Sequence, residues 1–420
     1  MTDSTGLTAQ KQKMFYGWRI VIASTLVITV TYGVIYSFGI FIPFYQTAFH
    51  ADSAVVSGAY SVCLLVYMGF TMVAGWAVDR FSPRTTTLAG GLLMLAGFLL
   101  SSRATAIWQL YAGYTIIGLG MSPNYNPLIA TVSRWFNRKR GMALGILSTG
   151  VGAGPLLFSP FISYLATRVG WQSTLVIIGS IAGVTIIGSA FVLKGRPSDM
   201  NLLPYGETAP GDAPADSKTK SAAAEGFTLK ESLRTRTLWL LAFSSLMFGF
   251  GLQVLMSHLV PYAEWRNLNP ITASVVLSTV SGVSIIGRMV MGTASDRFGK
   301  AKGLAICLIG QGVMTLALAF AFNSWMLFVF AGVLGFFYGG YPPQLPALVS
   351  ENMGLAHLGV ILGVTSTAWG IGSAISPFVT GYIVDTTGNY PLAFITGGSA
   401  VISGGLMCLW IKRPKRLIPA

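Results

Sequence analysis

Two motifs in this sequence each occur twice, at nearly the same separation. The stretch Gly75–Phe81 reads Gly-x-x-x-Asp-Arg-Phe, and the same pattern returns in Gly292–Phe298, 217 residues later. A second block repeats at a separation of 218 residues, with Gly141, Gly145, Ser148, Thr149, Gly152 and Gly154 matching Gly359, Gly363, Ser366, Thr367, Gly370 and Gly372. Because two independent blocks share nearly one register, the sequence predicts two structural repeats that run in the same direction.

The composition indicates that these repeats lie in a lipid bilayer. Hydrophobic residues make up 53% of the chain, whereas only 10% of residues are charged. A helix needs about 20 apolar residues to cross roughly 30 Å of hydrocarbon. Twelve such spans are predicted, six in each half, at approximately 17–45, 54–78, 85–102, 107–133, 141–166, 172–193, 237–262, 271–294, 302–322, 325–350, 358–384 and 390–411. Parallel repeats in a membrane chain are typical of transporters, so we expect function to lie between the halves.

The expected fold is an all-α membrane protein with two pseudo-symmetric bundles of six helices. Residues 1–193 form the first bundle, 194–236 a linker, and 237–420 the second bundle with a tail. The middle of the linker is rich in Pro, Ala, Ser, Asp and Lys, so it buries too little apolar area to fold alone. Thr228-Leu-Lys-Glu231 has the spacing of a capping box, which predicts a short surface helix before the seventh span.

Basic residues fall almost entirely on one side of the predicted spans, together with the linker and both termini. The other side has only Arg103, Arg168 and Arg266. Lys and Arg are retained in the cytoplasm during insertion, so both termini are predicted to be cytoplasmic. This topology also explains the formal charge of +14 without a nucleic-acid partner. Short loops and the absence of targeting elements favour the plasma (inner) membrane of a bacterium.

Residues that carry catalytic or metal chemistry do not assemble into a motif. Cys63, Cys307 and Cys408 fall within predicted spans at irregular spacing, which suggests neither a disulfide framework nor a metal site. No Ser-His-Asp set, metal-ligand cluster or phosphate-binding Walker loop can be assembled either. We therefore expect no enzyme activity, no metal and no cofactor, and any transport should be secondary.

Three further patterns carry a family resemblance. They are Tyr16-Gly17-Trp18, Arg134-Trp135-Phe136-x-x-Lys139-Arg140-Gly141 and Gly287-Arg288-Met289-x-x-Gly292. The twelve spans, the linker and the paired Gly-x-x-x-Asp-Arg loops resemble the major facilitator superfamily over essentially the whole chain. The three patterns resemble its monocarboxylate transporter and oxalate/formate antiporter branch. This resemblance implies a central cavity reached alternately from each side, and small organic anions as cargo, often moved with a proton.

Arg288 is the first candidate for binding such an anion. It lies well inside the eighth predicted span, where a charge costs several kcal/mol unless it faces a cavity or a partner. No Asp or Glu lies near the middle of any predicted span, so a permanent salt bridge is the weaker alternative. A guanidinium offers a fork of donors that matches a carboxylate. We therefore expect Arg288 to hold the anionic end of the substrate.

The number of cations within the predicted spans limits which anions the chain is expected to bind. The eleventh predicted span, 358–384, contains no Lys or Arg, whereas the oxalate/formate branch is understood to carry a second cation there for a dianion. A single cation favours a monocarboxylate such as lactate or pyruvate. Antiport of organic anions and an aromatic monocarboxylate remain alternatives, because tyrosine-rich spans can accept a ring. The expected partners are this substrate, a proton and the lipid bilayer, and we expect a monomer.

His258 is the histidine at membrane depth, in the seventh span. An imidazole titrates in the physiological range and also donates a hydrogen bond, so His258 can carry a proton or bind substrate; a neutral packing role is the equal alternative. Animal monocarboxylate transporters have an acidic residue where this chain has Ser284, and their first-span lysine is also missing here. Their proton relay cannot be transferred, and Arg288 paired with the substrate carboxylate is the other candidate switch.

The remaining candidates line or gate the expected cavity. In this superfamily the first, fourth, seventh and tenth spans line the centre, which makes Tyr36, Asn124, Tyr125, Asn126, Tyr338 and Tyr341 candidates for binding substrate. At cytoplasmic span ends, Asp79, Arg80, Asp296 and Arg297 are expected to latch the halves together when the cavity opens outward. The repeated glycines are interpreted as close-packing surfaces between helices.

Overall fold

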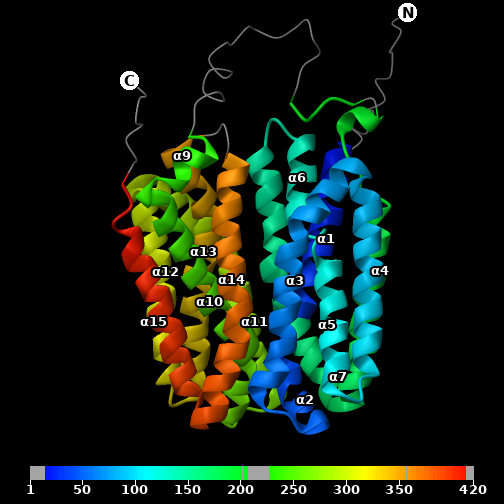
Figure 1. The fold of residues 1–420 in the computed structure, drawn as a ribbon, viewed down its shortest axis with the longest axis vertical. Coiled ribbons are helices and arrows are strands. Elements are labelled where there is room, and N and C mark those ends of the chain that lie inside the picture. The colour runs from blue at the N-terminus through cyan, green and yellow to red at the C-terminus, as the bar shows by residue number, and fades with distance from the viewer. Residues whose placement is uncertain (1–14, 201, 207–226, 355–357, 413–420) are drawn as a thin grey trace, which may run out of the picture.

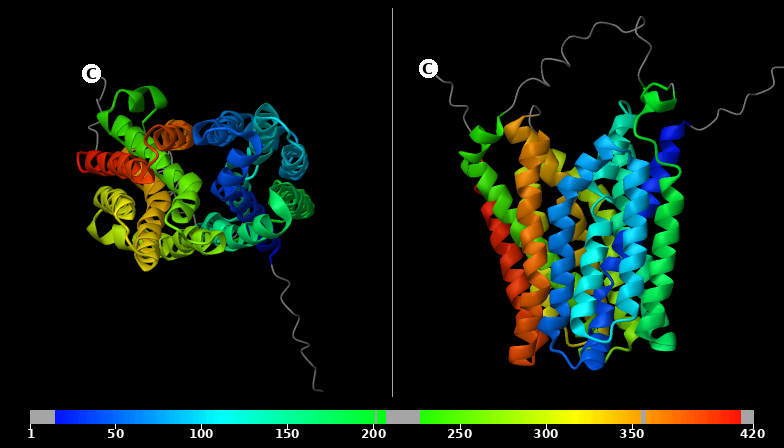
Figure 2. Two further views of the ribbon diagram at one scale, coloured as in Figure 1. Left: turned by 90° about the horizontal axis from the view of Figure 1, so that it is seen from below. Right: turned by 45° about the vertical axis from the view of Figure 1, so that its right-hand side comes forward.

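The computed structural model describes residues 15–200, 202–206, 227–354 and 358–412. Long helices stand side by side in two groups, one from each half of the sequence (Figures 1 and 2). Ten helical segments in the described ranges are long and apolar enough to cross a membrane. One of the ten has 51 residues and another predicted span is broken into two helices, so the described chain accounts for all twelve predicted spans.

The first half contains the six N-terminal spans. Its elements are α1 (Tyr16–Ile35), η1 (Phe38–Phe41), α2 (Ile42–Phe49), α3 (Ser53–Arg80), α4 (Pro83–Ser102), α5 (Ile107–Met121), α6 (Asn126–Trp135) and α7 (Arg140–Ala190). Within α7 the backbone leaves helical geometry at Gly170, with φ 79° and ψ 162°. Glycine adopts this positive φ without steric cost, so Gly170 divides α7 into the predicted fifth and sixth spans.

The second half repeats this arrangement. Its elements are α9 (Leu229–Leu233), α10 (Arg236–Trp265), α11 (Pro270–Phe298), α12 (Lys300–Ala319), α13 (Ser324–Met353), α14 (Leu358–Thr387) and α15 (Tyr390–Cys408). The helix α9 is the predicted surface helix, and its capping box is formed by Thr228 and Glu231. The polar centre of the linker lies outside the described residues.

Two of the predicted spans are not regular α-helices over their whole length. The first, predicted at 17–45, leaves α-helical geometry after Ile35 and continues as η1 and α2 to Phe49. The fourth, predicted at 107–133, is interrupted at 122–125 and resumes at Asn126-Pro127. Pro123 lies in this interruption; proline lacks an N–H and restricts the residue before it, so a break here relieves strain that a continuous helix would carry.

A matched pair of amides shows the duplication in three dimensions. Asn124 donates from Nδ2 to the carbonyl of the residue four positions earlier, at 3.1 Å, and lies 3.6 Å from the sulfur of Met94 on α4. Gln344 donates from Nε2 to the carbonyl four positions earlier, at 2.9 Å, and lies 3.2 Å from the sulfur of Cys307 on α12. Equivalent helices in the two bundles are therefore joined in the same way.

The linker is attached to both bundles where the structure describes it. The backbone N–H of Tyr205 donates to the carbonyl of Trp135 at 2.9 Å, and Asn137 donates back to Tyr205 at 3.2 Å. In the second half, the N–H of Phe227 donates to the carbonyl of Met353 at 2.8 Å. The two attachment points are equivalent loops, one before α7 and one before α14.

The two halves contact each other through α3 with α14 and through α7 with α11. We call the end that carries Arg80, Arg134, Arg140 and Arg297 the basic end, and the other the opposite end. Helix α1 begins and α15 ends at the basic end, as do the linker attachments (Figure 1). The shared placement of these helix ends agrees with the predicted even number of spans.

The halves are closed together at the opposite end and separated at the basic end. On α14, a Cβ added to Gly381 would lie 2.7 Å from Ala54 of α3, and one added to Gly370 would lie 2.7 Å from Met68. Nearer the basic end, a Cβ on Gly75 or Gly363 would meet nothing within 4 Å. Gly363 lies eighteen residues before Gly381, about five helical turns, so both occupy the same face of α14.

The second contact, between α7 and α11, opens in the same direction. A Cβ on Gly152 of α7 would lie 2.9 Å from the carbonyl oxygen of Ser281 on α11. Towards the basic end, Gly141 and Gly145 would meet nothing within 4 Å. The α3–α14 and α7–α11 contacts therefore describe one state, in which the interior is reached from the basic end.

Candidate functional site

Arg288 lies on α11 at the boundary between the two halves. Its guanidinium is half-buried and donates from one terminal nitrogen to the backbone carbonyl of Ser148, on α7 of the other half. The guanidinium carbon lies 5.9 Å from the centre of the Tyr338 ring. Its Nε is buried and has no hydrogen-bond partner. Arg288 therefore contacts both halves and retains donor capacity.

The counterion of Arg288 is not supplied by a described side chain. Among residues whose side chains the structure describes, no carboxylate forms an ion pair with Arg288. A carbonyl oxygen offers a dipole rather than a full charge, so it neutralises a buried guanidinium only in part. The position therefore suits an anionic ligand.

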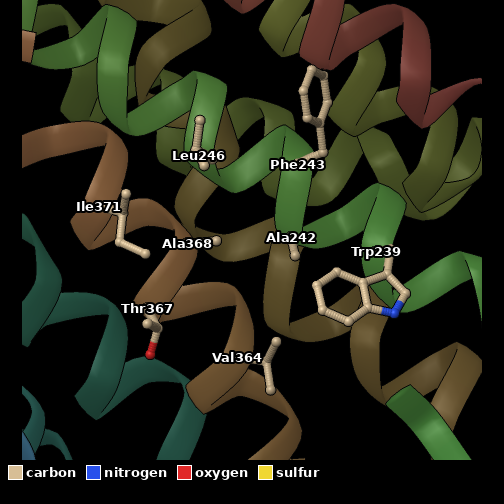
Figure 3. A pocket seen from close by; sticks show the side chains of 8 residues that line it. All are labelled: Trp239, Ala242, Phe243, Leu246, Val364, Thr367, Ala368 and Ile371. Atoms are coloured by element: carbon tan, nitrogen blue, oxygen red, sulfur yellow. The ribbon is translucent and has the colours of Figure 1, made fainter. Parts of the chain in front are cut away.

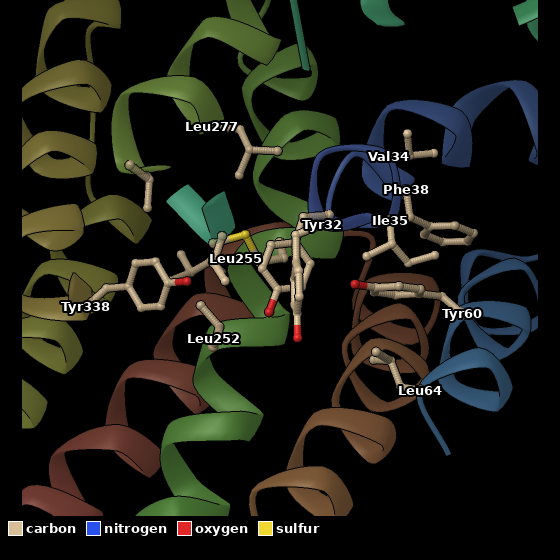
Figure 4. Packing of buried hydrophobic residues seen from close by; sticks show 14 of the residues in the cluster. Tyr32, Val34, Ile35, Phe38, Tyr60, Leu64, Leu252, Leu255, Leu277 and Tyr338 are labelled. Carbon is tan, nitrogen blue, oxygen red and sulfur yellow. The ribbon is translucent and has the colours of Figure 1, made fainter. Parts of the chain in front are cut away.

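Tyrosines from both halves gather beside Arg288. We call Tyr32, Tyr36, Tyr67, Tyr125 and Tyr338 the tyrosine cluster. The Tyr32 ring packs edge-on against Tyr36 at 5.1 Å and Tyr125 at 5.5 Å, and its hydroxyl lies 3.0 Å from that of Tyr67. The phenols of Tyr125 and Tyr338 interact electrostatically with Arg288. Figure 4 shows Tyr338 pointing into the same interior region as Tyr32 and Tyr60.

This combination defines what the site can bind. Phenol hydroxyls donate and accept hydrogen bonds, and their ring faces accept apolar groups. Leu252 and Leu255 of α10 add aliphatic surface to the same region (Figure 4). One fixed positive charge within a wall of phenols and leucines matches a small ligand that has one carboxylate and a short apolar body.

Three other candidates for binding substrate lie elsewhere. Tyr341 packs inside the second bundle, with its hydroxyl 2.8 Å from that of Ser245 and its ring stacked on Phe248 at 3.8 Å. Asn124 is buried inside the first bundle, where its amide nitrogen also lies 3.3 Å from the hydroxyl of Thr31. Asn126 is exposed at the start of α6. The structure thus brings Tyr36, Tyr125 and Tyr338 to the region of Arg288, whereas Tyr341 and Asn124 hold their own bundles together.

His258 lies in the contact between the halves that is closed at the opposite end. It is fully buried on α10, and its Nε2 lies 3.3 Å from both the Ser57 hydroxyl of α3 and the Pro377 carbonyl of α14. Its Nδ1 has no hydrogen-bond partner. His258 therefore joins the two halves, but it is not part of the tyrosine cluster.

The expected gate residues lie at the separated basic end. Arg80 and Arg297 are exposed at the ends of α3 and α11. The side chains of Asp79 and Asp296 lie outside what the structure describes. The predicted latch stays a prediction, because it belongs to a state in which this end is closed.

Sequence reasoning missed several residues that connect the halves. The Tyr60 hydroxyl of α3 donates to Oε1 of Gln253 on α10 at 3.2 Å, and the Nε2 of Gln253 is buried without a partner. Ser148, which accepts from Arg288, was also missed, as was Tyr67, which belongs to the tyrosine cluster within the first half. A polar residue on a span that faces the partner half was the available signal, but the relevant face is known only once the halves are packed.

A pocket of about 560 Å³ lies between α10 and α14, away from Arg288 (Figure 3). Its walls are apolar apart from Thr367, and Trp239, Phe243 and Ile371 are exposed side chains within it. These walls suit hydrocarbon rather than a carboxylate. In the described ranges, no group of three or more His, Cys, Asp or Glu side chains is placed to hold a metal ion.

Comparisons with known proteins agree with this architecture. Rat monocarboxylate transporter 12 is 27% identical over 96% of this chain and 86% of its own length. Human monocarboxylate transporter 11 is also 27% identical, over 95% of this chain and 83% of its own length. A crystal structure of a bacterial homologue of the human lysosomal transporter Spinster, described as inward-facing and unoccupied, aligns with a TM-score of 0.69. It shares 14% identity and covers 94% of this chain and 95% of its own, so it supports the fold alone.

The family profile extends this agreement over most of the sequence. The profile of the Major Facilitator Superfamily matches residues 24–292 and 259–420, and so includes both bundles. Together with the duplicated six-span halves, this match shows that the chain is a multi-pass membrane protein that belongs to the major facilitator superfamily and resembles its monocarboxylate transporters.

Proposed function

We propose that this protein is a secondary active transporter of small monocarboxylates of the lactate or pyruvate type, which it moves by alternating access together with a proton. The observation that carries the proposal is Arg288, a half-buried cation that reaches across the boundary of the halves and has no described carboxylate partner. An unpaired cation in this position costs several kcal/mol. A bound carboxylate would offset this cost and would contact both halves at once.

The open end indicates which side the site faces. If the basic end lies in the cytoplasm, as the retention of Lys and Arg predicts, the described state is inward-facing. Both termini are then cytoplasmic. Placement in a bacterial plasma membrane and a monomeric state remain predictions, and the two monocarboxylate transporters named above come from animals.

Proton coupling has two candidate carriers. His258 is a titratable group within the closed contact between the halves, with one ring nitrogen unpartnered. Arg288 with the substrate carboxylate is the other, because a neutral pair crosses a low-dielectric region more easily than a single charge. In both schemes a proton entering with the anion keeps the moving site close to neutral.

A second candidate cargo is an aromatic monocarboxylate. The observation that favours it is the tyrosine cluster, where edge-on ring pairs at 5.1 Å and 5.5 Å show that the region accepts aromatic packing. Counterflow with unlabelled lactate, formate and benzoate would rank these cargoes. Exchange that occurs only with an anion on both sides would instead indicate antiport.

The direct test is uptake of labelled lactate into proteoliposomes, with and without an inward proton gradient. We expect gradient-stimulated uptake by the intact chain and none above background with Arg288→Ala. Arg288→Lys keeps the charge but loses the paired fork, so uptake should fall roughly 10- to 100-fold. Arg103→Gln removes an exposed arginine at the opposite end and should behave as wild type. Unchanged uptake by Arg288→Ala would overturn the proposed role.

A further inference from the structure

The N-terminus of α3 is capped by a carboxylate from the other half of the molecule. The backbone N–H of Ser53 donates to Oδ1 of Asp385 at 2.9 Å, and that of Ala54 donates to Oδ2 at 2.6 Å. Asp385 lies near the end of α14. The first N–H groups of a helix have no partner within it, and its N-terminus favours a negative charge. Asp385 therefore satisfies two donors of α3 and joins the halves at the opposite end.

The residue that would normally cap α3 is not used. Asp52 occupies the N-cap position with extended backbone, φ −66° and ψ 158°, but its side chain makes no capping hydrogen bond and is exposed. Aspartate is among the preferred N-cap residues, because its oxygen accepts from the N–H two or three residues further on. The Asp52 side chain is thus available for capping, while the carboxylate of Asp385 occupies the N-terminus of α3.

The cap belongs to a larger contact that must separate when the opposite end opens. One turn before Asp385, a Cβ on Gly381 would lie 2.7 Å from Ala54. Further along the same face of α3, the Ser61 hydroxyl accepts from the backbone N–H of Phe378 at 3.2 Å. The bonds to Asp385 therefore break whenever α3 and α14 part at this end.

We propose that Asp385 and Asp52 cap α3 in turn. Asp385 holds the opposite end closed in the described state, and Asp52 takes over the same helix N-terminus when the halves separate. In this exchange Asp52 would accept from the N–H of Ala54, so a carboxylate remains at the N-terminus of α3 in both states, and the N–H of Ser53 would bond to water when that end opens. This inference rests on the alternating access of the proposed function, but it does not depend on the identity of the cargo.

The two carboxylates make opposite predictions although they lie at the same helix end. Asp385→Ala removes the cap of the closed state, so the population open at the opposite end should rise about fivefold. Asp52→Ala removes the cap of the other state and should lower that population by about the same factor. A general effect of negative charge at this surface would instead move both variants in one direction.

The experiment measures these populations in the full chain without substrate. Spin labels at Thr105 and Asn267, exposed positions at the opposite end of the first and second halves, report their separation by pulsed electron spin resonance in proteoliposomes. The exchange is supported if the share of long distances between the labels rises in Asp385→Ala and falls in Asp52→Ala. Asp385→Asn retains one acceptor oxygen and should give a smaller increase, which covers the case in which the alanine variant folds poorly.

Thr386→Ala is the matched control, because Thr386 is exposed beside Asp385 and bonds only to carbonyls of its own helix. It should leave the distance distribution unchanged. Shifts of both aspartate variants in the same direction, or no shift in either Asp385 variant, would overturn the proposal. Opposite shifts in a protein that does not take up lactate would leave the exchange standing and would reject only the cargo.

Discussion

The position of Arg288 is energetically costly without a ligand and favourable when an anion binds. It is a charged side chain in a membrane span, half-buried, with one nitrogen on the carbonyl of Ser148 and its Nε without a partner. A fully satisfied arginine would be a structural bridge, and a fully exposed one would need no ligand. Arg288 is neither, and one tyrosine from each half, Tyr125 and Tyr338, lies beside it. A carboxylate placed there completes its hydrogen bonds and joins the halves.

His258 allows the two schemes of proton coupling to be separated. His258→Gln keeps an amide donor for the Pro377 carbonyl but removes the titratable ring. If His258 carries the proton, lactate counterflow should stay within about twofold of wild type while stimulation by an inward proton gradient is lost. Uptake and counterflow in the same proteoliposome preparation measure both quantities.

Ser57→Ala is the control for this variant, because it removes the hydroxyl partner of His258 but keeps the imidazole. It should retain stimulation by the gradient. Stimulation that persists in His258→Gln would exclude His258 as the carrier and would favour the pair formed by Arg288 and the substrate.

The sequence was sufficient to select Arg288 and the nearby Tyr36, Tyr125 and Tyr338 as candidates, but not Tyr67 or Gln253. A single arginine inside an apolar span is rare enough to stand out. Tyr67 and Gln253 did not stand out, because phenols and amides also occur in spans as packing groups, as Tyr341 and Asn124 do here. The role of Gln253 depends on the register between the halves, and that of Tyr67 on packing within the first bundle; no local pattern encodes either.

At the scale of elements, two glycines of α14 have different surroundings. Gly381 lies against Ala54 in the closed region, whereas Gly363, on the same face, has nothing within 4 Å of its added Cβ. The sequence singled out Gly363, but not Gly381, as a glycine that packs helices closely. It did not indicate that Gly363 would lie open in the described state, because that depends on how the two bundles are packed.

Because their surroundings differ, substitution of Gly363 or of Gly381 by valine should have opposite effects on which end of the protein is open. Gly363→Val should fold normally in the described state but prevent α3 from approaching at the basic end, so transport should fall at least tenfold with the basic end held open. Gly381→Val should hinder closure at the opposite end and favour the other state. Labelling of single cysteines introduced at each end measures which end is accessible. Equal accessibility in the two variants would contradict this account of α14.

The breaks within spans show a similar limit. Pro123 lies within the fourth span, which separates there into α5 and α6 rather than bending. Proline shows where helical hydrogen bonds are lost, but packing of the neighbouring helices decides whether the result is a kink or a break. The number of spans was therefore predictable, and their continuity was not.

At the scale of the whole molecule, the duplication supports the proposed alternating access. Two bundles of similar fold meet along α3 with α14 and α7 with α11, and both contacts are closed at one end and open at the other. Rotation of one bundle against the other would exchange the closed end for the open one around Arg288. The repeat predicted this architecture of two bundles, whereas the end at which the halves are separated is evident only from the packed structure.

The central claim is that a carboxylate held by Arg288 draws the two halves together at the basic end. Spin labels at Met142 on α7 and Val360 on α14, which are 57% and 55% exposed, measure the distance between the halves there. The three native cysteines are buried and should not take up the label. The measurement is made in proteoliposomes, with and without lactate, for the otherwise intact chain and for Arg288→Ala.

Lactate should increase the population with short distances in the intact chain and leave Arg288→Ala unchanged. A chain that transports lactate without any change in this distance, or an equal change in Arg288→Ala, would contradict the account.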